Sequence, residues 1–118
     1  MGGESTMNET AGLGCFAQAA AFPLQDFQGG SVDHMIQMNL AMYQITLGEH
    51  PEYRIPYFSY RGTPTGIDIF SVVESGQSPV MDIGVAGKDG GQIGAGVLTA
   101  PVECFQQAVA AYRERYAS

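Results

Sequence analysis

Charged residues are scarce in this sequence. They make up 14% of 118 residues, against roughly a quarter in an average soluble domain. Basic residues are the fewest, with five Lys and Arg against twelve Asp and Glu, which gives a formal net charge of −7. An acidic surface repels phosphate backbones, so this composition argues against nucleic acid as a partner. So few charges also predict that part of the surface is covered by another domain or subunit.

Long hydrophobic runs are also absent. No stretch approaches the roughly 18 consecutive apolar residues that a membrane helix needs, so no membrane partner is expected. The start of the chain, residues 1–11, is polar and acidic without a basic leader, which predicts a cytoplasmic protein. Residues 1–9 show no periodic pattern and are expected to be flexible, while residues 10–118 are long enough for a single domain with one core.

Cysteine and histidine give no sign of a metal site or of covalent catalysis. Cys15 and Cys104 stand alone in apolar stretches, without a CxxC pair or a nearby His cluster, and no Gly-x-Ser-x-Gly motif occurs. Neither a metal nor another cofactor is expected. Both cysteines are predicted to be buried, reduced thiols, because free Cys behaves as a small hydrophobe.

The pattern of apolar residues predicts an α+β fold with a central apolar helix, a short mixed sheet and a C-terminal helix. A three-layer α/β arrangement is the alternative. Helices are predicted over residues 12–22, 32–47 and 69–75 and from Pro101 onward, and strands over residues 53–60 and 79–86. The helix over 32–47 has Ser31 or Asp33 as its cap and Gly48 as its end. It carries apolar residues on most sides, which places it centrally or in an interface.

The segment from Arg61 to Asp68 (RGTPTGID) is the first candidate site. Arg suits a bidentate hold on a carboxylate or phosphate. Thr63, Thr65 and the free amides before the next helix would add donors to the same anion. The alternative is a plain turn, in which Asp68 only caps that helix and Arg61 pairs with a surface Glu.

The second candidate is the glycine-rich stretch over residues 84–96. Here Lys88, Gln92, Gly94 and Gly96 could form a nest for an anion, although a tight turn is the simpler alternative. It lacks the Ser or Thr of a phosphate-binding P-loop. Asp82 either faces this site or has a structural role, because an ionised carboxylate is costly in an apolar strand. We predict that Arg61 and residues 91–96 converge on one anion.

A family resemblance follows from several segments in order: residues 9–17 (ETAGLGCFA), 45–51 (ITLGEHP), 61–69 (RGTPTGIDI), 72–97 (VVESGQSPVMDIGVAGKDGGQIGAGV) and 100–108 (APVECFQQA). Together they resemble the C-terminal part of the YlbE-like proteins. These are longer bacterial proteins associated with a subunit of oxamate carbamoyltransferase in allantoin degradation. The family pattern has an Asn and a His-Lys pair where this sequence has Asp82 and Gly87-Lys88, a departure that bears on activity.

The resemblance implies transfer of a carbamoyl group between phosphate and an oxamate-like acceptor. It also implies further enzyme subunits or copies of the chain as partners, and a chain that is inactive alone. The sequence therefore favours a domain or subunit of a carbamoyltransferase-like enzyme that binds an anionic substrate. The alternative is a non-catalytic assembly module whose central helix packs on a partner.

Overall fold

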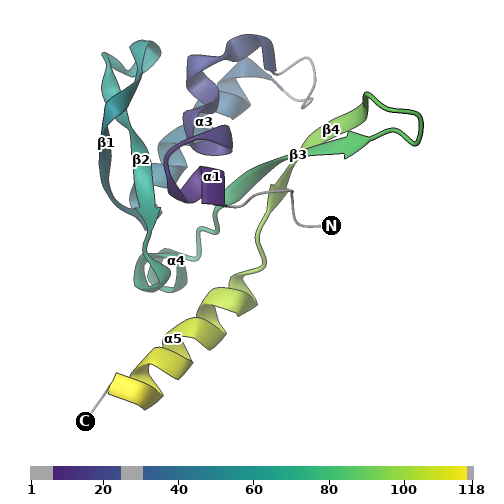
Figure 1. Ribbon diagram of the computed structural model, residues 1–118. Coiled ribbons are helices and arrows are strands. Elements are labelled where there is room, and N and C mark those ends of the chain that lie inside the picture. Colours follow the sequence, from purple (N-terminus) through teal and green to yellow (C-terminus); the bar gives the residue numbers. More distant parts are fainter. Residues whose placement is uncertain (1–6, 25–30, 117–118) are drawn as a thin grey trace.

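The computed structural model describes residues 7–24 and 31–116, without the side chains of Leu24 and of residues 82, 84–86 and 92–95 (Figure 1). The elements run in the order α1 (Met7–Thr10), η1 (Gly14–Ala20), η2 (Phe22–Leu24), α3 (Val32–Met42), η3 (Tyr43–Ile45), β1 (Thr46–Ile55), η4 (Pro56–Phe58), β2 (Arg61–Ile67), α4 (Ile69–Ser75), β3 (Val80–Ala86), β4 (Gln92–Thr99) and α5 (Val102–Tyr116). Residues 7–9, assigned to a flexible terminus above, begin α1, and Glu9 in it is buried.

Helix α3 is the central helix of the molecule (Figure 1). It begins as predicted, because the Ser31 hydroxyl accepts a hydrogen bond from the His34 N–H at 3.1 Å. It ends at Met42, five residues before the predicted end. The reason is tertiary, because Thr46 already pairs with Ile67 in a β-ladder. Pairing with a distant strand thus overrides the helical pattern of residues 43–47.

The strands form two separate antiparallel pairs, β1 with β2 and β3 with β4. The predicted α+β class is confirmed, and so are the central apolar helix and the C-terminal helix. The strands differ in detail from the single mixed sheet predicted, because each strand pairs with its neighbour in sequence. The three-layer α/β alternative needs parallel strands and does not apply.

The first hairpin corrects two local predictions. Residues 61–66, predicted as a loop, belong to β2, and residues 46–52 belong to β1. The register of β1 shifts between Glu49 and Arg54, and at the tip η4 is followed by Ser59 (φ 55°) and Tyr60 (φ 61°) in left-handed conformation. Both strands contain proline and glycine, which are uncommon in strands, so the local sequence does not predict that they pair.

Segment η1 lies against α3 and the core. The predicted helix over 12–22 is a 3-10 segment over Gly14–Ala20, with a non-helical Ala17 inside. The Asn39 side chain joins the two elements: its Oδ1 accepts from the Ala19 N–H at 2.8 Å and its Nδ2 donates to the Phe16 carbonyl at 2.9 Å. The core beside it consists of buried residues from both halves of the chain: Cys15, Phe16, Met42, Ile45, Val72 and Val80.

The C-terminal half is less compact. The β3–β4 ribbon and α5 project from the body in different directions (Figure 1). The radius of gyration is 15.2 Å, above the roughly 13 to 14 Å expected for a compact domain of this length. None of the helices in the described ranges is long and apolar enough to cross a membrane. The molecule is therefore a packed body with two projecting elements.

Candidate functional site

Arg61 opens strand β2 and is held by two neighbours. Its Nε donates to Glu49 Oε2 at 2.6 Å, and its guanidinium lies over the Tyr43 ring, 3.6 Å from the ring centre. The side chains of Arg61 and Glu49 are both 44% exposed. This is the surface ion pair of the simpler alternative. An anion at Arg61 would share the guanidinium with Glu49, which lowers its affinity.

Tyr43 anchors this corner from the end of α3. Its hydroxyl donates to the Gly62 carbonyl at 2.7 Å. The pKa of the phenol is raised above 10.0, because burial disfavours the phenolate; Arg61 opposes this rise and Glu49 adds to it. Tyr43 therefore stays neutral at physiological pH and serves as a rigid platform for Arg61. The sequence analysis missed Tyr43 and Glu49, since only the fold brings them to Arg61.

The side chains of Thr63 and Thr65 in β2 lie against the turn at Gly12, just before η1. A Cβ built on Gly12 would lie 2.4 Å from Thr63 Oγ1 and 2.5 Å from Thr65 Oγ1. Thr65 donates to the Thr63 carbonyl at 3.0 Å. Thr63 is buried, and its hydroxyl has no hydrogen-bond partner within the described ranges. Both hydroxyls thus lie close against the turn before η1, and Thr63 is closed off from solvent.

Asp68 is the helix cap of the simpler alternative. Its Oδ1 accepts from the Phe70 N–H at 3.0 Å and its Oδ2 from the Ser71 hydroxyl at 2.8 Å. Helix α4 then ends at Gly76, in left-handed conformation at φ 73°. With both carboxylate oxygens engaged, Asp68 stabilises the start of α4.

The glycine-rich stretch forms the end of the second hairpin. Gly87 donates to the Gly91 carbonyl at 2.7 Å, and Gly90 donates to the Gly87 carbonyl at 3.1 Å. Lys88 is exposed in this turn. The simpler alternative, a tight turn, therefore describes residues 87–91. Gln92, Gly94 and Gly96 belong to β4, and Asp82 belongs to β3 opposite Val97. The side chains of Asp82 and Gln92 lie outside the described part.

The predicted convergence of Arg61 with residues 91–96 is wrong for this structure. Arg61 belongs to the β1–β2 pair and residues 92–96 to the β3–β4 pair. The two hairpins lie on opposite sides of the body, separated by α3 (Figure 1). Local sequence patterns do not determine how these two segments lie relative to each other, because each segment pairs only within its own hairpin.

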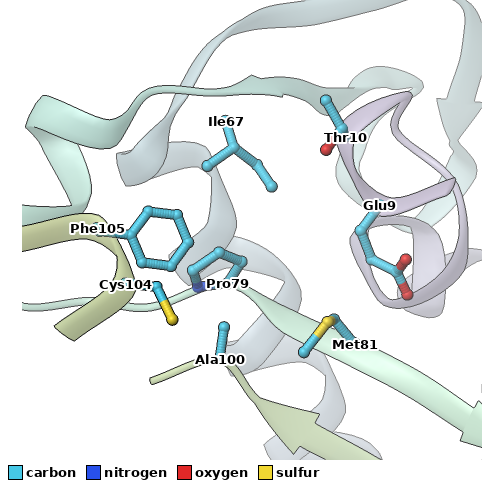
Figure 2. Close-up of a pocket in the computed structure, with 8 residues that line it drawn as sticks. All are labelled: Glu9, Thr10, Ile67, Pro79, Met81, Ala100, Cys104 and Phe105. Atoms are coloured by element: carbon cyan, nitrogen blue, oxygen red, sulfur yellow. The ribbon is translucent and has the colours of Figure 1, made fainter. Parts of the chain in front are cut away.

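A pocket of about 300 Å³ lies where α5 meets the body (Figure 2). Its lining is Glu9, Thr10, Ile67, Pro79, Met81, Ala100, Cys104 and Phe105. These residues come from four of the five segments that carry the family resemblance. Apart from Glu9, each is an ordinary apolar or small residue in sequence, and only the fold brings them together. The sequence analysis therefore missed this pocket.

The polar groups of the pocket lie at one end. Figure 2 shows Glu9 and Thr10 on one side and the rings of Pro79 and Phe105 on the other. The Glu9 carboxylate accepts from the Cys15 N–H at 3.4 Å and is almost fully enclosed, with the residue 3% exposed. A carboxylate beside an apolar lining opposes the binding of a small anion.

The two cysteines differ in environment. Cys15 is buried, as predicted, but Cys104 is exposed on the first turns of α5 and borders the pocket. The prediction of two buried thiols is thus wrong for Cys104, because only one face of α5 packs against the body, and Cys104 lies between its packed neighbours Val102 and Phe105 but is itself exposed. Across residues 7–24 and 31–116, no group of three or more His, Cys, Asp or Glu side chains is placed to hold a metal ion.

No protein-family model matches the chain. The chain is 41% identical over 116 residues to a protein of Escherichia coli (strain K12) described as uncharacterized protein YahG, covering 97% of this chain and 25% of that protein. It is 37% identical over 115 residues to the oxamate carbamoyltransferase subunit AllG of the same organism, covering 95% of this chain and 27% of that subunit.

A solved structure has the same fold. The crystal structure of a conserved protein of unknown function from Enterococcus faecalis V583 superposes with a TM-score of 0.79 and 39% sequence identity, covering 87% of this chain and 25% of that chain. The chain thus spans about a quarter of the length of each of these proteins. It is related in sequence to one portion of longer bacterial proteins, one of which is a subunit of oxamate carbamoyltransferase.

Proposed function

We propose that this chain is a domain of a carbamoyltransferase-like enzyme and works only together with further parts of that enzyme. One observation carries the proposal: 37% identity over 95% of the chain to a subunit of oxamate carbamoyltransferase. The segments on which the resemblance was based also meet in space, since four of the five line one pocket. Identity spread over 95% of the chain supports a shared fold and, with it, the proposal of a comparable place in a larger enzyme.

A domain exchange tests this proposal. In the E. coli oxamate carbamoyltransferase subunit, the 37%-identical segment is replaced by this chain, and carbamoyl transfer by the assembled enzyme is measured. We expect measurable transfer by the chimera. The matched control carries the corresponding segment of the E. coli protein YahG, which shows whether the enzyme tolerates a diverged segment. Transfer by the control chimera but not by ours, with equal assembly, would contradict the proposal.

For the anionic substrate we propose Arg61 as the contact. Thr63, Thr65 and Asp68 make structural contacts, Lys88 with residues 92–96 lies on the other hairpin, and Asp82 has no described side chain. Arg61 keeps a half-exposed guanidinium, and Tyr43 holds its plane in place. A fixed planar guanidinium is suited to a carboxylate or phosphate, and in the described part of the chain Glu49 competes for it.

Anion binding at Arg61 has a measurable consequence. Phosphate, carbamoyl phosphate and oxamate should raise the melting temperature of the chain, because a ligand of the folded state stabilises it by mass action. Arg61→Ala should abolish this rise, and Glu49→Gln should enlarge it by removing the competing carboxylate. Arg54→Ala is the matched control on the same hairpin, since Arg54 bonds only to the Pro51 carbonyl in the described contacts. An unchanged rise in Arg61→Ala at constant ionic strength would refute this site.

A non-catalytic assembly module is the second candidate function, and one observation favours it. Several large apolar side chains are more than half exposed in the isolated chain: Met7, Leu47, Tyr57, Tyr60 and Tyr116. Exposed aromatic side chains are enriched in protein interfaces. An assembly role predicts no anion effect on the melting temperature together with retained assembly of the chimera. The two candidates therefore give different outcomes in the same experiments.

A further inference from the structure

The apolar stripe of α5 is longer than the surface it packs on. The stripe consists of Val102, Phe105, Val109, Tyr112 and Tyr116, which share one face of the helix. Val102 and Phe105 pack against the core, and Val109 is only 4% exposed. Tyr112 is 48% exposed and Tyr116 is 64% exposed. The stripe therefore continues past the end of the body, where α5 projects (Figure 1).

Three aromatic rings form a continuous surface at this end. The rings of Phe70 and Tyr112 meet edge to face with their centres 5.3 Å apart, and the rings of Tyr112 and Tyr116 are 4.9 Å apart. The Arg115 guanidinium lies 5.6 Å from the centre of the Tyr116 ring. We call Phe70, Tyr112 and Tyr116 the aromatic ladder. Tyr and Arg side chains of this kind dominate the energetics of many interfaces.

The contacts of α5 in the isolated chain are few for its length. It has 15 residues, of which only Val109 is buried, and it packs mainly on α4. Isolated helices of about 12 to 15 residues are marginal in water, so a helix of this kind depends on tertiary packing. The outer part of α5, from Tyr112 onward, contacts α4 through the Phe70 ring, and Tyr112 and Tyr116 stay largely exposed.

We propose that the aromatic ladder is a docking surface for the remainder of the enzyme, meaning the part that corresponds to the other three-quarters of the longer relatives. This proposal rests on the proposed function. The occupant is a polypeptide surface of apolar side chains bordered by carboxylates. Its apolar part covers Phe70, Tyr112 and Tyr116, and its carboxylates face Arg113 and Arg115 in the last turn of α5.

Two observations favour this occupant over a second copy of the chain. The relatives extend far beyond this segment, which covers 25% and 27% of them, so a large protein surface is available to it. The chain itself carries a net charge of −7, and two copies would repel each other. The basic last turn of α5 is an exception in this acidic chain and is complementary to an acidic partner.

Hydrogen exchange in the chimera described above tests the proposal. In the isolated chain, the amides from Tyr112 to Tyr116 should exchange rapidly. In the chimera, the same amides should exchange at least about tenfold more slowly, because a docked helix opens rarely. Tyr112→Ser and Tyr116→Ser should each remove most of this protection, whereas Tyr112→Phe should keep it. Tyr57→Ser is the matched control. It changes an exposed ring at the tip of the β1–β2 hairpin and should leave α5 protected.

The outcomes separate this proposal from the proposed function. Protection of α5 in a chimera that transfers no carbamoyl group would leave the docking surface intact and refute the enzymatic role. A chimera that is active while α5 exchanges as in the isolated chain would refute the docking surface. Sedimentation of the isolated chain tests whether a second copy is the occupant. Self-association that protects α5 and is lost in Tyr116→Ser would show that it is. This result would also overturn the proposal.

Discussion

The two longest helices of the molecule, α3 and α5, are held in different ways. Helix α3 has 11 residues, buries four of them and carries a polar connection to η1 through Asn39. Helix α5 has 15 residues and buries one. The amount of packing thus does not follow helix length. The residues around α3 form a packed core, whereas Tyr112 and Tyr116 in the outer part of α5 are largely exposed.

The largest expected effect concerns Asn39 in the body. Asn39→Ala removes the partner of the Ala19 N–H and of the Phe16 carbonyl, and it leaves a cavity between α3 and η1. We expect a loss of about 3 kcal/mol in the free energy of unfolding, since each buried unsatisfied group costs about 1 to 3 kcal/mol. Urea denaturation measures it. Gln37→Ala, an exposed change in the same helix, is the control; equal losses in the two variants would contradict the role of Asn39.

The next effect concerns the turn before η1. Gly12 has φ 87°, and an added Cβ would meet the hydroxyls of Thr63 and Thr65. Gly12→Ala should therefore cost about 2 kcal/mol of stability through backbone strain and steric conflict. Gly48→Ala is the control, because a Cβ at Gly48 meets nothing within 4 Å. A double variant with Thr63→Ala should recover part of the loss; a strictly additive loss would show that the conflict lies elsewhere.

A gain in stability is expected at a second buried amide of the body. Gln18 is fully buried, and neither its Nε2 nor its Oε1 has a hydrogen-bond partner in the described part of the chain. Gln18→Met keeps the length of the side chain and removes both polar atoms, so it should stabilise the fold by about 1 kcal/mol. Thermal denaturation of both proteins gives the difference. A clear loss of stability instead would mean that the amide of Gln18 has a partner, such as an ordered water.

The smallest change in stability is expected at Tyr112, in the outer part of α5. Tyr112→Ser should change the stability of the isolated chain by less than about 0.5 kcal/mol, because its side chain is half exposed. Val109→Ala, three residues earlier on the same stripe, should cost about 1 to 2 kcal/mol through lost burial. Measured together by urea denaturation, the two variants define where the packing of α5 ends. Similar losses would show that the stripe is packed along its whole length.

Local signals in the sequence predicted the helix boundaries that depend on local chemistry. The Ser31 and Asp68 caps need only neighbouring residues, and both are present. The strands were harder. Residues 61–66 read as a loop because of Gly62, Pro64 and Gly66, yet pairing with β1 makes them a strand. Such pairing depends on residues outside the local pattern, such as Gly48 opposite Thr65 and Glu49 opposite Pro64.

The candidate site shows the same division. Arg61 and Asp68 were singled out by residue type, and both simpler alternatives given for them describe their contacts. The partner of Arg61 was not predictable, because a bulge in β1 sets which residue lies beside it. The pocket was not predictable either, since it combines residues from Glu9 to Phe105 whose individual types carry no functional signal.

Each described strand has only one pairing partner, so every strand in the described ranges also has an open edge. The two ribbons differ in whether proline interrupts these open edges. Pro51 and Pro64 interrupt the hydrogen-bonding groups of the first, whereas Val80–Ala86 and Gln92–Thr99 contain no proline. The projecting second ribbon therefore offers its main-chain N–H and C=O groups as a template on which another strand can extend the sheet. If copies of the isolated chain associate strand to strand at high concentration in spite of their like charge, this association should begin there.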